Sequence, residues 1–126
     1  MDNIYCLVGK ILENAQYIEW NIALAVYDSQ KDNEKINVDD LFSEMQNSTM
    51  GKIISYAKET GIFDKESLVE LEYILEKRNY LAHQFFKKND IVKHQYNTNF
   101  LQNKIGELRN ILSRFQNFNH WLAKEV

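Results

Sequence analysis

Apolar residues recur every three or four positions along most of the chain, which is the spacing of an amphipathic helix. One long stretch of this kind covers about residues 3–27, and its apolar positions are Ile4, Leu7, Val8, Ile11, Leu12, Ala15, Ile18, Ile22, Ala25 and Val26. Another covers about residues 98–123, with Phe100, Leu101, Ile105, Leu108, Ile111, Leu112, Phe115, Phe118 and Leu122 facing inward. The pattern therefore predicts a long helix at each end of the chain.

Two further helical segments are predicted between them. After a polar loop at 29–35, Asp39 or Asp40 can cap a short turn, and Ser48 can cap a second piece that ends at Gly61. Asp64 is a good N-cap for the next helix, and Asn89 can end it. The apolar positions of that helix are Leu68, Leu71, Ile74, Leu75, Leu81, Ala82, Phe85 and Phe86.

Composition agrees with a helical fold. The 126 residues contain no proline and four glycines, too few turn residues for a β-sandwich of this size. Length and the 44% apolar content predict one domain over residues 1–126, an all-α, antiparallel four-helix bundle with a broken second helix. No apolar run suits a membrane span, no secretion signal is visible, and Cys6 is the single cysteine, expected at the edge of the core. These features favour the cytoplasm.

Charge is unevenly distributed along the predicted third helical segment. Residues 64–76 hold five acidic residues and one lysine, whereas residues 77–94 hold five basic residues and one aspartate. Lys77, Lys87 and Lys88 belong to the basic part. A solvated helix whose charges suit its own dipole explains this asymmetry. A basic patch for a polyanion explains the second half equally well.

Two charged residues fall on predicted core faces. Arg78 lies at the centre of its helix's apolar stripe, and Glu19 lies within the stripe of the first helix. A guanidinium keeps its proton, so its burial demands a partner or a polar cavity. We therefore expect Glu19 and Arg78 to approach each other. A buried ion pair that only fixes register is one interpretation.

Beside Arg78 the same helix has a polar edge formed by Asn79 and His83, which are four residues apart and therefore neighbours. A lone histidine on a helix is more often a surface residue than a catalyst. Here it accompanies an arginine, an asparagine and the basic pair Lys87 and Lys88. This combination favours a functional site.

The segment Arg78-Asn79-Tyr80-Leu81-Ala82-His83 resembles the signature of the HEPN superfamily, an Arg and a His separated by four to six residues, commonly with a polar residue after the Arg. The motif covers six residues, and the likeness to the family's helical bundle covers most of the chain. The resemblance implies a homodimer that cleaves single-stranded RNA without a metal or other cofactor. In that interpretation Arg78, Asn79 and His83 are catalytic, Glu19 orients the arginine, and Lys77, Lys87 and Lys88 bind RNA.

The resemblance also implies a role in defence or in a toxin–antitoxin pair, with a cognate antitoxin or nucleotidyltransferase as partner. Some HEPN toxins carry a tyrosine two residues after the His, which a nucleotidyltransferase modifies, and this chain has Phe85 there. The alternative function is a non-catalytic RNA-binding or protein-interaction module in which the Arg78–Glu19 pair is structural.

Other chemistries are disfavoured by spacing. The carboxylates at 66/70 and 72/76 lack the arrangement of a magnesium-dependent pyrophosphohydrolase and suit a solvated helix face. The three histidines have no zinc-ligand spacing with one another or with Cys6. Tyr17, Trp20 and Trp121 fall off the apolar stripes and are candidates for a partner surface.

Overall fold

A computed structural model describes the backbone of residues 2–125 and the side chains of residues 2–124. The described residues form six helices and no strand, which confirms the all-α class. These helices are α1 (Asp2–Gln30), α2 (Val38–Gln46), α3 (Met50–Thr60), α4 (Lys65–His83), α5 (Phe85–Lys88) and α6 (Thr98–Glu125).

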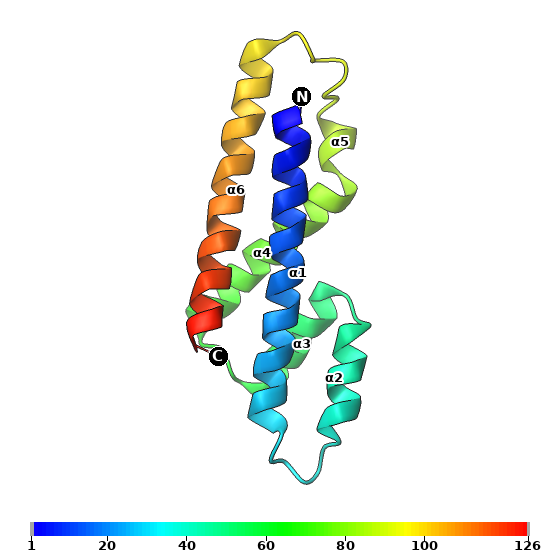
Figure 1. The fold of residues 1–126 in the computed structure, drawn as a ribbon, viewed down its shortest axis with the longest axis vertical. Coiled ribbons are helices and arrows are strands. Elements are labelled where there is room, and N and C mark those ends of the chain that lie inside the picture. Colours follow the sequence, from blue (N-terminus) through cyan, green and yellow to red (C-terminus); the bar gives the residue numbers. More distant parts are fainter. Residues whose placement is uncertain (1, 126) are drawn as a thin grey trace.

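The two long helices lie side by side and run in the same direction, from the top of Figure 1 to the bottom. The Asn21 amide in α1 donates a hydrogen bond to Oδ1 of Asn119 in α6 (2.8 Å), at a similar distance from the start of each helix. The antiparallel arrangement that we expected therefore does not hold for this pair. The long connection through α2 to α5 returns the chain to the end where α1 begins, and this return makes the parallel pairing possible.

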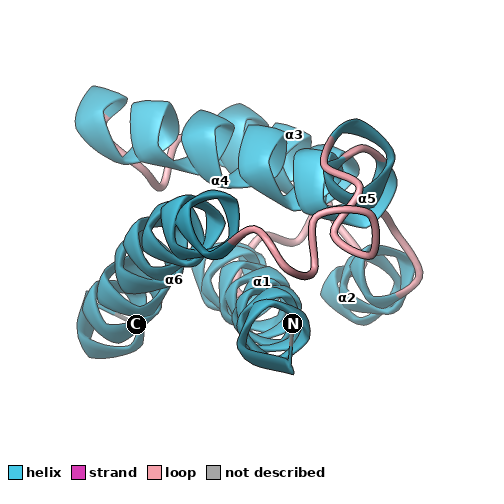
Figure 2. Ribbon diagram, turned by 90° about the horizontal axis from the view of Figure 1, so that it is seen from above, coloured by secondary structure: helices cyan, strands magenta, loops and turns pink. Residues whose placement is uncertain are grey.

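Helix α1 is the centre of the molecule, because α2, α3, α4 and α6 all pack against it. Figure 2 shows α1, α2 and α6 nearly end-on, with α4 lying across them. The largest fully buried side chains are Phe85, Phe115, Ile4, Ile11, Ile18, Ile22, Met45, Met50, Leu71, Ile74, Leu108 and Leu122. They come from every helix, so burial of apolar area joins all six into one core.

Several predicted helix ends are confirmed. Oδ1 of Asp64 accepts the backbone N–H of Ser67 (2.7 Å) as the N-cap of α4. Gly61 ends α3 in the left-handed region (φ 67°), which a residue without Cβ adopts freely. The other two caps were wrong by one to three positions, because Asn37 caps α2 and Thr49 caps α3.

The single helix expected from Asp64 to Asn89 is broken. Helix α4 ends at His83, Gln84 leaves the helical geometry, and the short α5 ends at Asn89. The Asn89 side chain is buried and donates to both the Tyr80 hydroxyl and the Phe85 carbonyl (3.0 Å each), so it ties α5 to α4.

Three positions are more exposed than the apolar pattern predicted. Ala82 and Phe86 lie at the surface, and Cys6 is exposed rather than packed at the core edge. For Phe86 the reason is local: the helix breaks at Gln84, whereas Leu81 in the last turn of α4 and Phe85 at the start of α5 remain buried. Among the described residues, no helix combines the length and apolar character that a bilayer span requires.

Candidate functional site

Arg78 lies on the last two turns of α4, where that helix leaves the core. Its side chain is half-buried, and its guanidinium donates a hydrogen bond to Oδ1 of Asn79 (3.1 Å). No carboxylate among the described side chains comes within 4.0 Å of it. Arg78 therefore keeps a positive charge at the protein surface that no ion pair neutralises.

Glu19 and Arg78 approach each other, as expected, but they do not form an ion pair. Arg78 is close enough to lower the pKa of Glu19, yet burial of that carboxyl has the larger, opposite effect and raises its pKa. Their charged groups do not form an ion pair within 4.0 Å. The guanidinium is instead hydrogen-bonded to Asn79 at a partly exposed position and so avoids the cost of full burial.

His83 is the last residue of α4, and its side chain is exposed. Its side chain forms no hydrogen bond with any other described residue. It lies five positions after Arg78, which corresponds to about 140° around a helix. The two side chains therefore leave α4 on different sides, and one chain does not bring the two groups together on one face.

Lys77 is held by aromatic rings. Its ammonium lies 5.7 Å from the ring centre of Tyr73 and 5.8 Å from that of Tyr80. Both distances allow a cation–π attraction. Lys87 and Lys88 are exposed on α5. Of these three basic residues, Lys77 is the most restrained.

An exposed aromatic pair lies beside the two lysines of α5, and sequence reasoning missed it. The rings of Tyr5 and Phe86 lie 5.6 Å apart, and the side chains are 43% and 42% exposed. The buried Phe85 packs edge-on against Phe86, with ring centres 5.0 Å apart. The pattern placed Phe86 in the core, and only the break at Gln84 turns it outward.

The acidic first part of α4 has the opposite character. Arg114 of α6 makes a two-point contact with the Glu70 carboxylate (2.7 and 3.2 Å), and its guanidinium lies 3.4 Å from the ring centre of Tyr73. Lys58 of α3 pairs with Glu72 (3.0 Å). The expected solvated face thus carries surface ion pairs. In residues 2–124, no three His, Cys, Asp or Glu side chains cluster in a way that would hold a metal ion.

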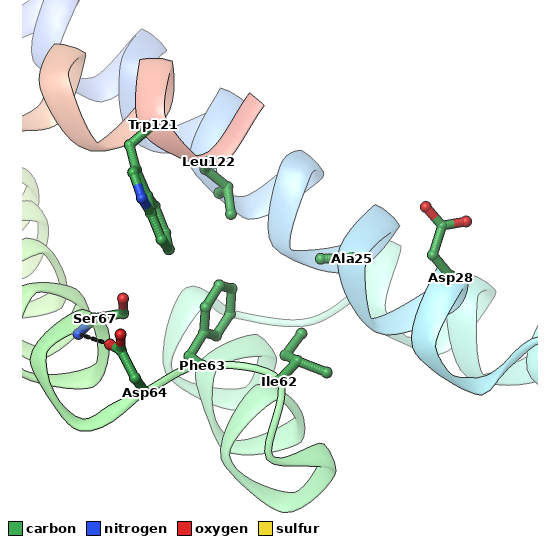
Figure 3. Close-up of a pocket in the computed structure, with 8 residues that line it drawn as sticks. All are labelled: Ala25, Asp28, Ile62, Phe63, Asp64, Ser67, Trp121 and Leu122. Carbon is green, nitrogen blue, oxygen red and sulfur yellow. Dashed lines mark hydrogen bonds between the residues drawn. The ribbon is translucent and has the colours of Figure 1, made fainter. Parts of the chain in front are cut away.

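A cavity of about 420 Å³ lies at the other end of α4 (Figure 3). Its lining residues are Ala25, Asp28, Ile62, Phe63, Asp64, Ser67, Trp121 and Leu122. None of the seven predicted site residues lines it. Glu19 lines a separate, smaller pocket of about 100 Å³ between α1, α2 and α3, together with Trp20 and Met45.

The basic end of α4 is therefore an open surface rather than an enclosed cleft: Arg78 and Asn79 are joined, Lys77 is held by two rings, and His83 projects from the helix end. Such a surface suits an extended anionic ligand more than a small one. No family model, no curated protein and no solved structure matches this chain.

Proposed function

We propose that the protein is a HEPN-like, metal-independent endoribonuclease that cleaves single-stranded RNA as a homodimer. The observation that carries this proposal is the environment of Arg78. Its guanidinium has no acidic partner within 4.0 Å among the described side chains and is hydrogen-bonded to Asn79. The exposed His83 follows Arg78 by five positions. If α2–α3 and α4–α5 each count as one broken helix, the chain has the four helical segments of the family's bundle.

The chemistry assigns a role to each residue. The ribose 2′-oxygen attacks the adjacent phosphorus, and the 5′-oxygen of the next nucleotide leaves, giving a 2′,3′-cyclic phosphate and a 5′-hydroxyl end. One His83 removes the proton from the 2′-hydroxyl, and the partner's His83 donates a proton to the leaving oxygen. Arg78 holds the phosphate through two N–H groups and stabilises the charge that develops on it. Asn79 orients the guanidinium through the hydrogen bond it accepts.

A second copy of the chain completes this site. Arg78 and His83 of one protomer leave α4 about 140° apart, so a second copy that adds its own arginine and histidine is needed to surround one phosphate. One protomer also offers a single histidine on this surface, whereas the reaction uses an acid and a base. Dimerisation supplies both. The exposed end of α4, with Ala82 and His83 uncovered, is the surface on which two copies would meet.

The aromatic pair of Tyr5 and Phe86 supports a single-stranded substrate. Exposed rings next to lysines bind unpaired bases by stacking while the lysines attract the backbone. Lys87 and Lys88 follow Phe86 directly. A paired duplex would hide its base faces from these rings, so the surface suits a single strand.

The test is cleavage of labelled single-stranded RNA in excess EDTA, with the wild type compared with Arg78→Ala and His83→Ala. We expect wild-type cleavage and its loss in both variants. Arg109→Ala and His120→Ala are the matched controls, because both residues are exposed on α6 and neither belongs to the proposed site. Circular dichroism establishes that each variant is folded, and sedimentation measures the dimer. Arg78→Lys keeps the charge without the two-point geometry and is expected to restore only part of the activity.

The alternative is a non-catalytic RNA-binding or interaction module. It predicts that a folded, dimeric wild type cleaves none of several RNAs, and that Arg78→Ala changes binding alone. That alternative includes a structural Arg78–Glu19 pair, and no such ion pair forms within 4.0 Å among the described side chains. A single, exposed Cys6 suits a reducing compartment such as the cytoplasm for either function.

A further inference from the structure

The 420 Å³ cavity at the start of α4 has an apolar interior and a polar end (Figure 3). Trp121 of α6 and Phe63 of the α3–α4 connection form its aromatic wall, with ring centres 6.3 Å apart. Leu122, Ala25 and Ile62 complete the apolar part. This volume lies in the range of about 300–1,000 Å³ that is usual for small-molecule sites. The cavity is thus large enough for an organic ligand with an apolar body.

The polar side chains of the cavity are two carboxylates and one hydroxyl, and no basic residue lines it. Oδ1 of Asp64 accepts the Ser67 N–H (2.7 Å), and a hydrogen bond from the Ser67 side chain also acts on this carboxylate. Asp28 lies at the opposite end of the pocket, in the last turn of α1, where no basic residue accompanies it. Neither aspartate forms an ion pair within the described part of the chain.

The backbone adds to this negative charge. Three helices bring their C-terminal ends to the cavity: α1 through Asp28, α3 through Ile62 just past its end, and α6 through Trp121. Each such end carries a partial negative charge of about half an elementary charge. The one N-terminal end at the cavity, that of α4, is already capped by Asp64. The last turn of α6 contains one basic residue, the exposed Lys124, which does not line the cavity.

We propose that this cavity binds a small organic cation, an amine with an aromatic or aliphatic body. Its ammonium group lies at the Asp64–Ser67 end, where it donates to the Asp64 carboxylate and to the Ser67 hydroxyl oxygen. The body packs against Trp121 and Phe63, whose ring faces also attract a cation. Asp28 contributes through the field rather than through a direct contact. The backbone hydrogen bond from Ser67 lowers the pKa of Asp64, so the carboxylate keeps its charge in mildly acidic solution.

Trp121 provides a direct readout, since it lines the cavity. The other tryptophan, Trp20, packs edge-on against Phe42 between α1 and α2 and is replaced by Phe so that emission comes from Trp121 alone. The folded Trp20→Phe protein is titrated with 2-phenylethylamine. Its neutral and anionic counterparts, 2-phenylethanol and 2-phenylacetate, have the same ring and a similar length. We expect a saturable change in emission with the amine alone.

Two charge-removing variants test the assignment of the carboxylates. Asp64→Asn keeps a good N-cap, because Asn caps helices about as well as Asp, so α4 is retained while the charge is lost. Asp64→Asn and Asp28→Asn are each expected to raise the Kd of the amine about two- to fivefold, as for other partly exposed charge pairs. The matched control is Glu66→Gln, which removes an exposed acidic charge next to Ser67 that does not line the cavity. Its Kd is expected to stay at the parent value.

Three outcomes overturn the proposal: no saturable change with the amine, equal binding of the alcohol, or a Kd that neither aspartate variant changes. Binding of the alcohol or the acetate alone would identify an apolar or anion site instead. Because this cavity is at the far end of α4 from Arg78 and His83, none of these results bears on RNA cleavage.

Discussion

The two ends of α4 differ in whether their charged side chains form ion pairs. In its first half, Glu70 and Glu72 are paired with Arg114 and Lys58. At its end, Arg78 and His83 have no acidic partner within 4.0 Å in the described structure. Paired charges mainly support the fold, whereas unpaired ones remain available to a ligand. Whether a charged residue has a partner therefore distinguishes structural residues from functional candidates better than its position in the sequence does.

The largest effect is expected when one residue at each end is replaced and both RNA cleavage and amine binding are measured for each variant. His83→Ala is expected to slow RNA cleavage by about 10²–10⁴-fold, the usual contribution of a general acid or base, and to leave 2-phenylethylamine binding unchanged. Asp64→Asn is expected to weaken amine binding and leave cleavage unchanged. Both assays are run on both proteins. If either substitution changed both readouts, the two ends would not act independently.

A second effect, smaller than the first, concerns RNA affinity. Replacing Lys87 and Lys88 by Gln removes two exposed charges of α5 and is expected to weaken RNA binding most at low salt. The slope of log K against log salt should fall by about 0.7 for each lost phosphate contact on a single strand. Fluorescence anisotropy at several salt concentrations measures this. The matched control is the double replacement of Lys31 and Lys35, which are exposed in the loop at the opposite end of α1. An equal loss in the control would mean that the basic end has no special role.

A third prediction concerns the turn that brings α3 to the start of α4. Gly61 has a φ of 67°, so Gly61→Ala is expected to destabilise the fold by about 1 kcal/mol through backbone strain. Gly106→Ala is the control, because Gly106 lies within α6 with open space where its Cβ would be, and alanine there favours the helix. Denaturant unfolding measures both. If Gly61→Ala were as stable as the parent, this turn would not constrain the cavity end.

The smallest effect is expected at Glu19. Burial raises the pKa of this carboxyl above its ordinary value of 4.5, so the folded protein binds this proton more tightly than the unfolded chain does. Its contribution to stability is therefore greatest below about pH 4.5 and decreases as pH rises through the raised pKa. Glu19→Gln removes this dependence and is expected to leave the stability at pH 7 equal or slightly higher. Denaturant unfolding from pH 4 to pH 7 measures it, and a marked loss at pH 7 would indicate a stabilising pair with Arg78.

Local sequence signals predicted the start of α4 and the end of α3 well. Asp64 and Gly61 act through hydrogen bonds and backbone geometry within a few residues, so their roles follow from residue type and position. The break at Gln84 is different, because the apolar spacing continues through Phe85 and Phe86. It depends on how α4 crosses α1 and on the bonds from Asn89 to Tyr80 and Phe85, which no local pattern contains.

The same limit applies to the candidate site. The helical spacing brought Glu19 towards Arg78, but it made Asn79 a neighbour of His83, whereas Asn79 accepts its hydrogen bond from Arg78. It did not predict that the guanidinium would stay partly exposed, because that depends on how helices pack. The aromatic pair of Tyr5 and Phe86 joins residues that are 81 positions apart, and the cavity of Figure 3 joins the ends of four helices. Such sites arise from tertiary packing, which residue spacing along one helix does not encode.

The most direct test of the central claim uses an RNA substrate whose cleavage position has been mapped. That oligonucleotide is compared, in excess EDTA, with one that carries a single 2′-deoxy nucleotide on the 5′ side of the cleaved bond. We predict that the all-RNA strand is cut to a 2′,3′-cyclic phosphate and a 5′-hydroxyl end, and that the deoxy substitution abolishes this cut, because the 2′-oxygen is the nucleophile. Cleavage that persists at the deoxy position, or that produces 5′-phosphate ends, would contradict the account.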